Sequence, residues 1–353
     1  IILCLLTFIL SVTGTFLVRS GILNSVHTFA SDPSRGIYIL FFLGIMIFTS
    51  LIIFFKKCKK ESYNFNLKTR ETFILINNWF MAFFLVTVLV GTLYPIFLDV
   101  ITDIKISVGP PFYNIVIIPL VVPFLFLMAV GPQFKWINSQ NIKFYKTIFI
   151  FFSAVVINLF IYYFFGSYSI LTNLIFIVAI FLILHCFLDA KQSMYKNKKF
   201  EYPRIISHFG FGLLVLCIGI NHQYSLEVDF NLKVGENKKI NNYEIYFENI
   251  KTEQNKNYQS VIGNFKLIDS TKNLVQYLNP EIRIYSNPET LTYEAAIKSK
   301  ITSDFYLTMS NVSRSEYYNI KFQNKPFMIW IWISAFIIAI GGFVQVILKK
   351  NEN

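Results

Sequence analysis

Charged residues are scarce in this sequence of 353 residues, since only 15% are Asp, Glu, Lys or Arg. Hydrophobic residues instead make up 54% of the chain, including 39 phenylalanines, and the mean hydropathy is +0.52. A soluble globular domain carries about 25% charged residues, so this composition excludes an ordinary soluble fold. It is typical of an integral membrane protein.

Cysteine is also scarce, and the four thiols, Cys4, Cys58, Cys186 and Cys217, include no Cys-x-x-Cys pair. Such pairs are typical of thiol–disulfide exchange, so we exclude that chemistry from the chain itself. We interpret the four cysteines as small buried or cytosolic thiols, because an unpaired cysteine packs as a small hydrophobic residue.

The sequence contains several long apolar runs without charged residues. A bilayer core about 30 Å thick needs about 20 apolar residues per helix. The runs cover residues 1–18, 36–55, 73–98, 113–130, 147–165, 170–188, 205–220 and 327–348. The sequence therefore predicts an all-α polytopic membrane bundle of about eight transmembrane helices. Because the first run starts at residue 1 with neither an initiator Met nor a signal peptide, we also expect a preceding N-terminal part of the same protein.

The net charge of +12 is distributed by loop rather than gathered on one face, which argues against nucleic acid as a partner. Basic residues concentrate in segments 56–71, 133–146, 189–204 and 349–350, while the alternate loops carry only Arg19 and Arg35, Lys105, or none. By the positive-inside rule the basic set faces the cytoplasm, or the matrix of an organelle. We therefore expect a multi-pass protein of the bacterial inner (cytoplasmic) membrane, or of the mitochondrial inner membrane, surrounded by the lipid bilayer.

Residues 221–325 change from continuous apolar runs to strict alternation, as in the sequence LEVDFNLKV from residue 226. Alternation with period two predicts half-buried strands. We expect about seven, at 226–234, 243–250, 261–268, 274–278, 281–285, 305–309 and 318–322. The predicted organisation is a seven-helix transmembrane region (1–220), an inserted small outer β-barrel or sandwich (221–325), and a final helix with a short basic inner tail (326–353).

His208 lies in the seventh apolar run, four residues after Arg204. An ionisable group in a spanning helix is a hypothesis of function by default. Gly212 and Gly219 share its helical face, which leaves room for a neighbouring helix backbone or for a flat macrocycle. Helix packing and cofactor binding therefore remain alternatives for this face.

His27 lies in the predicted outer loop between Arg19 and Arg35. The loop is apolar but broken by Gly, Asn and Pro, which predicts a segment at the membrane interface. The two arginines suit an anionic partner such as a carboxylate or propionate, and they also suit helix capping or lipid headgroups. His27 is either a ligand or a solvated side chain, and we interpret His185 and His222 as structural.

Several motifs in this order resemble one family, the CcmF/NrfE haem lyases. They are GTFLVRSG at 14–21, SVHTFA at 25–30, DPSRG at 32–36, GTLYP at 91–95, KISVGPP at 105–111, HFG at 208–210, EAAI at 294–297, and the stretch from KPF at 325–327 to WIW at 330–332. The resemblance covers essentially the whole chain. It departs from the family pattern at Lys256-Asn257-Tyr258, where the family has Gly-Pro before an aromatic-containing turn.

The resemblance implies a haem-handling subunit of the cytochrome c maturation system, of holocytochrome c synthetase type. It implies that His27 is an outer axial ligand of haem iron and that His208 is a transmembrane ligand of a haem b, with quinol as its electron donor. Arg19, Arg35 and Gly212 would then border the haem sites. The implied partners are a periplasmic haem chaperone, apocytochrome c with its thiol-handling subunits, and the missing N-terminal part, which would hold both partner histidines and the tryptophan-rich haem motif.

Two alternatives come from other functional classes. One is a haem or small-molecule membrane transporter, and the other is a non-catalytic membrane scaffold of the maturation complex. An ion-coupled transporter needs intramembrane carboxylates or an arginine relay. The apolar runs carry almost none, which argues against the transporter.

Overall fold

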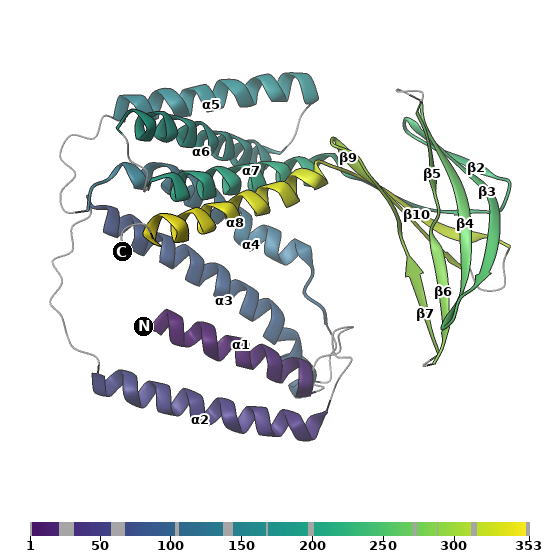
Figure 1. Ribbon diagram of the computed structural model, residues 1–353, viewed down its shortest axis with the longest axis horizontal. Coiled ribbons are helices and arrows are strands. Elements are labelled where there is room, and N and C mark those ends of the chain that lie inside the picture. Colours follow the sequence, from purple (N-terminus) through teal and green to yellow (C-terminus); the bar gives the residue numbers. More distant parts are fainter. Residues whose placement is uncertain are drawn as a thin grey trace. The chain divides into compact units, whose positions relative to one another are not determined.

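The computed structural model describes residues 2–20, 32–57, 68–102, 106–136, 144–166, 169–196, 201–270, 274–287, 289–311 and 316–350 (Figure 1). The chain divides into two compact units. One comprises Ile1–Leu120 with Lys135–Ser139, and the other comprises Val121–Phe134 with Gln140–Asn353. Each unit is described by itself.

The first unit contains α1 (Ile2–Ser20), α2 (Pro33–Lys57), α3 (Arg70–Thr102) and the start of α4 (Pro110–Val130). Helix α2 begins after Asp32, whose carboxylate accepts a hydrogen bond from the backbone N–H of Arg35 at 3.2 Å. That contact satisfies a donor that the first helical turn would otherwise leave unpaired. Helix α3 starts beside the segment after α4, because the N–H of Arg70 donates to the carbonyl of Lys135 at 2.9 Å.

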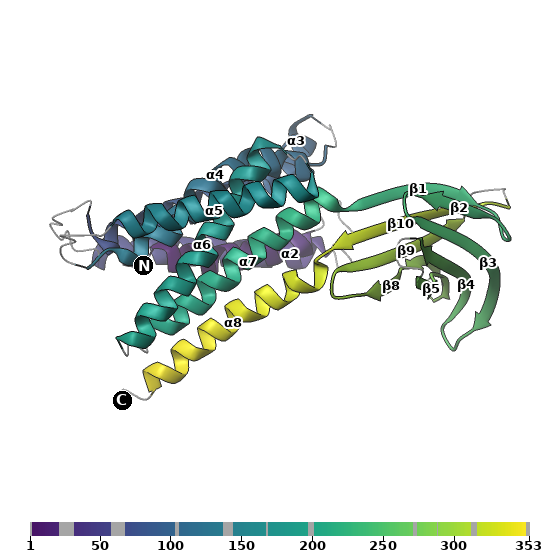
Figure 2. The ribbon, with the colours of Figure 1, turned by 90° about the horizontal axis from the view of Figure 1, so that it is seen from above.

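The second unit contains the rest of α4, the 3₁₀-helix η1 (Gly131–Gln133), α5 (Phe144–Phe165), α6 (Ile170–Tyr195), α7 (Tyr202–Tyr224) and α8 (Met328–Lys350). Ser169 caps α6 by accepting the N–H of Thr172 at 3.1 Å. Pro203 lies in the first turn of α7, where its missing N–H costs nothing. Helix α7 packs against both α6 and α8 (Figure 2).

The predicted membrane bundle is confirmed. Within the described ranges, all eight apolar runs form α-helices, and seven of them, α2 to α8, are long and apolar enough to cross a membrane. The apolar part of α1, Leu5–Ser20, is shorter. The protein is therefore a multi-pass membrane protein. Several helices continue past the predicted runs because a helix need not stop where the hydrocarbon core ends.

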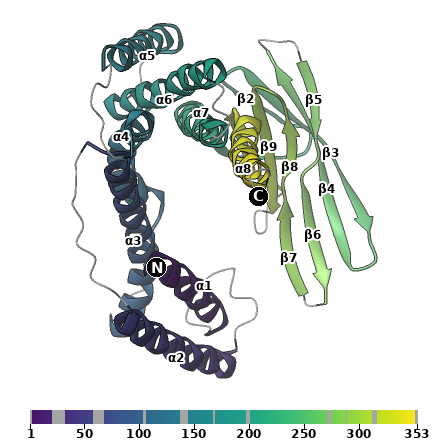
Figure 3. The same cartoon turned by 60° about the vertical axis from the view of Figure 1, so that its left-hand side comes forward.

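The inserted domain consists of two antiparallel sheets, as predicted (Figures 2 and 3). The first has the order β1-β10-β9-β8, and the second has the order β2-β3-β4-β6-β7 with β5 paired to β4. The strands are β1 (Leu226–Leu232), β2 (Asn237–Ile240), β3 (Tyr243–Gln254), β4 (Tyr258–Asp269), β5 (Leu274–Leu278), β6 (Glu281–Ser286), β7 (Glu289–Glu294), β8 (Ala296–Ser299), β9 (Ser303–Asn311) and β10 (Tyr318–Pro326). Their inner faces meet in an aromatic core in which the rings of Phe247 and Phe265 stack at 4.2 Å.

Seven strands were predicted by alternation and three were not. The missed strands are β2, β7 and β8. Strand β2 reads Asn-Lys-Lys-Ile and buries only Ile240, so it has no apolar alternation to detect. Strands β7 and β8 bury little, because each lies at the end of its sheet.

The β-domain joins the helices through two neighbouring connections. Helix α7 continues to Tyr224 and passes into β1, while β10 passes through Phe327, with a positive φ of 57°, into α8. The side-chain amide of Asn221 donates to the carbonyl of Pro326 at 2.7 Å, and the indole N–H of Trp330 donates to the carbonyl of Ile301 at 3.0 Å. Both contacts tie the domain directly to the α7–α8 pair.

Candidate functional site

His208 is half-buried in the second turn of α7, one helical turn after Arg204. Residues four apart lie on neighbouring positions of one helical face, about 6 Å apart along the axis at 1.5 Å per residue. Phe211 continues this face and meets Phe124 of α4 with ring centroids 6.0 Å apart. The predicted transmembrane histidine therefore lies inside the helical part of the second unit.

The contacts between α6 and α7 show which part of α6 lies beside His208. The two helices are antiparallel, because the contacts move backwards along α6 as they move forwards along α7. The contacting pairs are Asp189 with Arg204, Phe187 with Phe209, Ile183 with Gly212, and Phe176 with Gly219. His208 falls between the first two of these contacts. It is therefore level with the turn of α6 that runs from His185 to Asp189.

Gly212 and Gly219 both face α6. A Cβ at Gly212 would lie 3.0 Å from Ile183 and 3.4 Å from the carbonyl of Ala179, and one at Gly219 would lie 2.5 Å from Phe176. Of the two alternatives left open by the sequence, these distances favour helix packing at both glycines. A macrocycle beside Gly212 would have to displace the side chain of Ile183.

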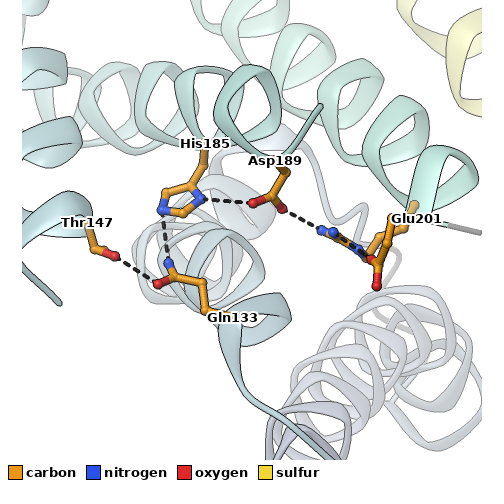
Figure 4. A network of polar contacts seen from close by, with 6 residues as sticks. Gln133, Thr147, His185, Asp189 and Glu201 are labelled. Carbon is orange, nitrogen blue, oxygen red and sulfur yellow. Dashed lines mark hydrogen bonds and ion pairs between the residues drawn. The ribbon is translucent and has the colours of Figure 1, made fainter. Parts of the chain in front are cut away.

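A buried polar network lies where α6 ends and α7 begins (Figure 4). The charge distribution assigns these two helix ends to the inner side of the membrane. Arg204 donates to Asp189 at 2.9 Å and to Glu201 at 2.9 Å. On the other side, Thr147 of α5 donates to the side-chain oxygen of Gln133 at 3.0 Å, and the Gln133 amide nitrogen lies 3.0 Å from Nε2 of His185. The network thereby connects four helical segments.

These contacts determine the tautomer of His185. Since the Gln133 oxygen accepts from Thr147, its nitrogen must donate to Nε2 of His185, which leaves the ring proton on Nδ1. Nδ1 points towards Asp189, but the Oδ1 atom is 4.0 Å away, too far for a hydrogen bond. No hydrogen-bond partner for Nδ1 is found among the described residues. His185 is 4% exposed, whereas His222 is exposed near the end of α7.

Arg19 and Arg35 lie at the two ends of the segment that contains His27, which is outside the described residues. The N–H of Asp32 donates to the carbonyl of Arg19 at 2.8 Å, so the end of α1 and the start of α2 are adjacent. Gly36 makes this approach possible, because a Cβ there would lie 2.9 Å from the backbone of Ser20. The guanidinium of Arg35 pairs with Asp32 at 3.1 Å.

Two of the motifs found in the sequence meet in the first unit. Gly91 and Tyr94 of α3 line a mostly apolar cavity of about 300 Å³ together with residues from 107–109 and the start of α4. A Cβ at Gly91 would overlap the hydroxyl of Tyr113, so any larger residue there would have to displace that side chain. The two blocks thus meet around this cavity.

Sequence reasoning missed the roles of Asp189, Glu201 and Gln133, and it used Arg204 only as a topology marker. One signal was available. Asp189 follows His185 by four residues, and Arg204 precedes His208 by four, so each ionisable residue shares a helical face with a histidine.

Comparison with known proteins gives consistent matches. Residues 223–326 match the family described as the CcmF C-terminal beta-sandwich. Over 99% of its length the chain is 30% identical to the cytochrome c-type biogenesis protein CcmF of Pseudomonas aeruginosa, of which it covers 55%. It is 31% identical to CcmF of Escherichia coli over 98% of its length, covering 54%, and 24% identical to NrfE of Haemophilus influenzae over 99%, covering 56%. The chain thus spans about half the length of the curated relatives it matches.

A solved structure named Cytochrome c Heme Lyase CcmF has the same fold. It matches 91% of this chain with a TM-score of 0.71 and 18% identity, and the match covers 52% of that structure's chain. The helical bundle and the inserted sandwich agree with these matches. The chain belongs to the CcmF/NrfE family and corresponds to its C-terminal part.

Proposed function

We propose that this chain is the haem-handling part of a haem lyase of cytochrome c maturation, located in the bacterial inner membrane or the mitochondrial inner membrane. The observation that carries the proposal is the position of His208, a half-buried imidazole inside a membrane-spanning helix, one turn from a paired Arg204. Ionisable side chains at such depth are costly and are typical of functional sites. The relatives named for cytochrome c-type biogenesis align along nearly the whole chain.

His208 would supply one axial ligand to a resident haem b. A neutral imidazole nitrogen can bind haem iron through its lone pair, and bis-histidine ligation supports electron transfer. When bound, that haem would supply electrons for reducing incoming haem, with quinol as the donor. We propose that a second residue, in the expected N-terminal part of the protein, would hold this haem together with His208. Helix α7 would hold the half-buried imidazole in this position.

Incoming haem, as substrate, would bind on the outer side. His27 is proposed as its axial ligand, and Arg19 and Arg35 as partners of its propionates. The adjacency of α1 and α2 supports this proposal, because it brings the ends that carry both arginines together. Arg35 already pairs with Asp32, so a propionate would compete with that carboxylate for the guanidinium.

Thioether formation would join this haem to apocytochrome c. Each bond forms when a cysteine S–H of the apocytochrome adds across a vinyl group, so both atoms of the thiol end in the product. The chain's role is binding and orientation. Cys186 and Cys217 are buried, so neither thiol can compete with the apocytochrome. The haem would arrive from a periplasmic chaperone, and thiol-handling subunits would keep the apocytochrome reduced.

The test is a set of histidine variants in the complete protein. We expect His208→Ala to remove most of the low-spin b-type haem spectrum, because the iron loses an axial ligand. We expect His27→Ala to keep that spectrum but to stop cytochrome c maturation. Both are measured by absorption spectra of the purified protein and by a cytochrome c production assay.

His222→Ala is the matched control, because His222 is exposed near the opposite end of the same helix as His208. It should change neither measurement. An unchanged haem spectrum in His208→Ala, at normal protein level, would return His208 to a packing role. Normal maturation in His27→Ala would remove His27 as a ligand.

A further inference from the structure

Arg204 binds two carboxylates in different ways. Glu201 belongs to the start of the same helix and lies three residues away, so its contact with Arg204 stays within one element. Asp189 belongs to α6, so its contact crosses from one helix to the other. Both N–O distances are 2.9 Å, and both carboxylates are partly buried, with side chains 27% and 18% exposed. Only the Asp189 contact can fix α7 relative to α6.

The glycine contacts between these helices restrain rotation and sliding of α7 poorly. Gly212 and Gly219 allow α6 to approach closely, but a glycine surface offers no side chain that resists rotation or sliding. A directional, charge-assisted bond from Arg204 to Asp189 restrains both motions. His208 is one turn away, so a rotation of α7 at Arg204 turns the imidazole by the same angle.

We propose that Asp189 is a positioning residue for His208, acting through Arg204 to set the direction of the imidazole. This inference rests on the proposed haem b at His208. A partly buried ion pair adds little net stability, because desolvation offsets the attraction, whereas in some helical assemblies a buried polar group specifies register.

The experiment compares Asp189→Ala with Glu201→Ala in the complete protein. Each substitution removes one carboxylate from the same guanidinium, so each has the same effect on local charge. We expect Asp189→Ala to lower haem affinity about tenfold, as loss of an outer-shell partner does at metal sites. We also expect a changed low-spin electron paramagnetic resonance signal, which reports the orientation of the axial imidazole. Glu201→Ala should leave this signal unchanged.

Asp189→Asn provides a milder variant in case Asp189→Ala fails to accumulate. Its amide oxygen still accepts from Arg204, so we expect a signal close to that of the unmodified protein. An equal change in the Asp189 and Glu201 variants would overturn positioning in favour of a charge effect. An unchanged signal in Asp189→Ala would overturn it directly. Absence of any His208-dependent haem in the unmodified protein would instead overturn the proposed function, and this inference with it.

Discussion

One face of α5 and the core of the β-domain place the same residue type in opposite surroundings. In the β-domain Phe247 and Phe265 are 1% and 0% exposed and stack against each other. On α5, Phe149 and Phe152 are 71% and 65% exposed. Because water surrounds the sandwich and hydrocarbon surrounds the spanning helices, burying phenylalanine stabilises the first and contributes little to the second.

The helices are held by a different set of contacts. Small residues allow close approach, as where Gly212 faces Ala179, and polar side chains bond across the interface, as where Asn158 of α5 donates to Asn173 of α6 at 2.9 Å. Such contacts are directional, so they determine which helices pair and at what rotation. In this protein, a few polar and small residues therefore add directional contacts to the apolar core that α4 to α7 share.

The largest effect that separates the two regions is expected from deleting a ring. Phe265→Ala in the β-domain should lower the free energy of unfolding by about 3 to 5 kcal/mol, because it leaves a cavity in a closed core. Phe149→Ala on α5 should change it by less than about 0.5 kcal/mol, since lipid replaces the lost contacts. The measurement is hydrogen exchange of each region in detergent-solubilised protein. Equal losses would mean that α5 packs against a protein surface and not lipid.

A smaller effect is expected from adding a methyl group between helices. A Cβ at Gly341 of α8 would overlap the hydroxyl of Ser207 and lie 2.8 Å from the carbonyl of Pro203. Gly341→Ala should therefore destabilise the α7–α8 pair by about 1 to 3 kcal/mol.

Gly342→Ala is the control for this substitution, because nothing lies within 4 Å of its Cβ position. It should stabilise the helix by up to about 1 kcal/mol, since alanine has the higher helix propensity. Thermal unfolding in detergent measures both variants. Similar midpoints for the two would show that α8 does not approach α7 at Gly341.

Most of the architecture could be predicted from the sequence, because the bilayer and the β-sandwich each impose a simple pattern. A spanning helix must be apolar over a known length, and a half-buried strand must alternate. The predictions failed where neither demand acts. Strand β2 is polar and pairs through its backbone, and α6 continues through a polar turn to Tyr195 because its end contacts other protein segments.

The candidate site was less predictable than the fold. His208 was identified from its depth in an apolar run, which is a local property. The partnership of Asp189 and Arg204 is not local, because it joins residues from two helices through a connecting segment that carries no periodic pattern. The sequence also could not decide what Gly212 contacts, since small residues suit a helix and a cofactor equally.

The smallest expected effect is a pH dependence confined to the β-domain. Burial, and next to it the charge of Asp269, raises the pKa of Tyr243 above its ordinary value of about 10. The unfolded chain therefore ionises Tyr243 before the folded domain does. The resulting stability is fully present below about pH 10 and is lost as the pH rises through the folded-state pKa.

Tyr243→Phe should weaken this alkaline loss, while at neutral pH it costs about 1 kcal/mol by removing the hydrogen bond from Asn324 at 3.0 Å. Tyr277→Phe removes the hydroxyl of a tyrosine that is 61% exposed and is the matched substitution control. Hydrogen exchange of the β-domain at pH 7 and above pH 10 compares the three proteins, and an undiminished alkaline loss in Tyr243→Phe would assign it to another group.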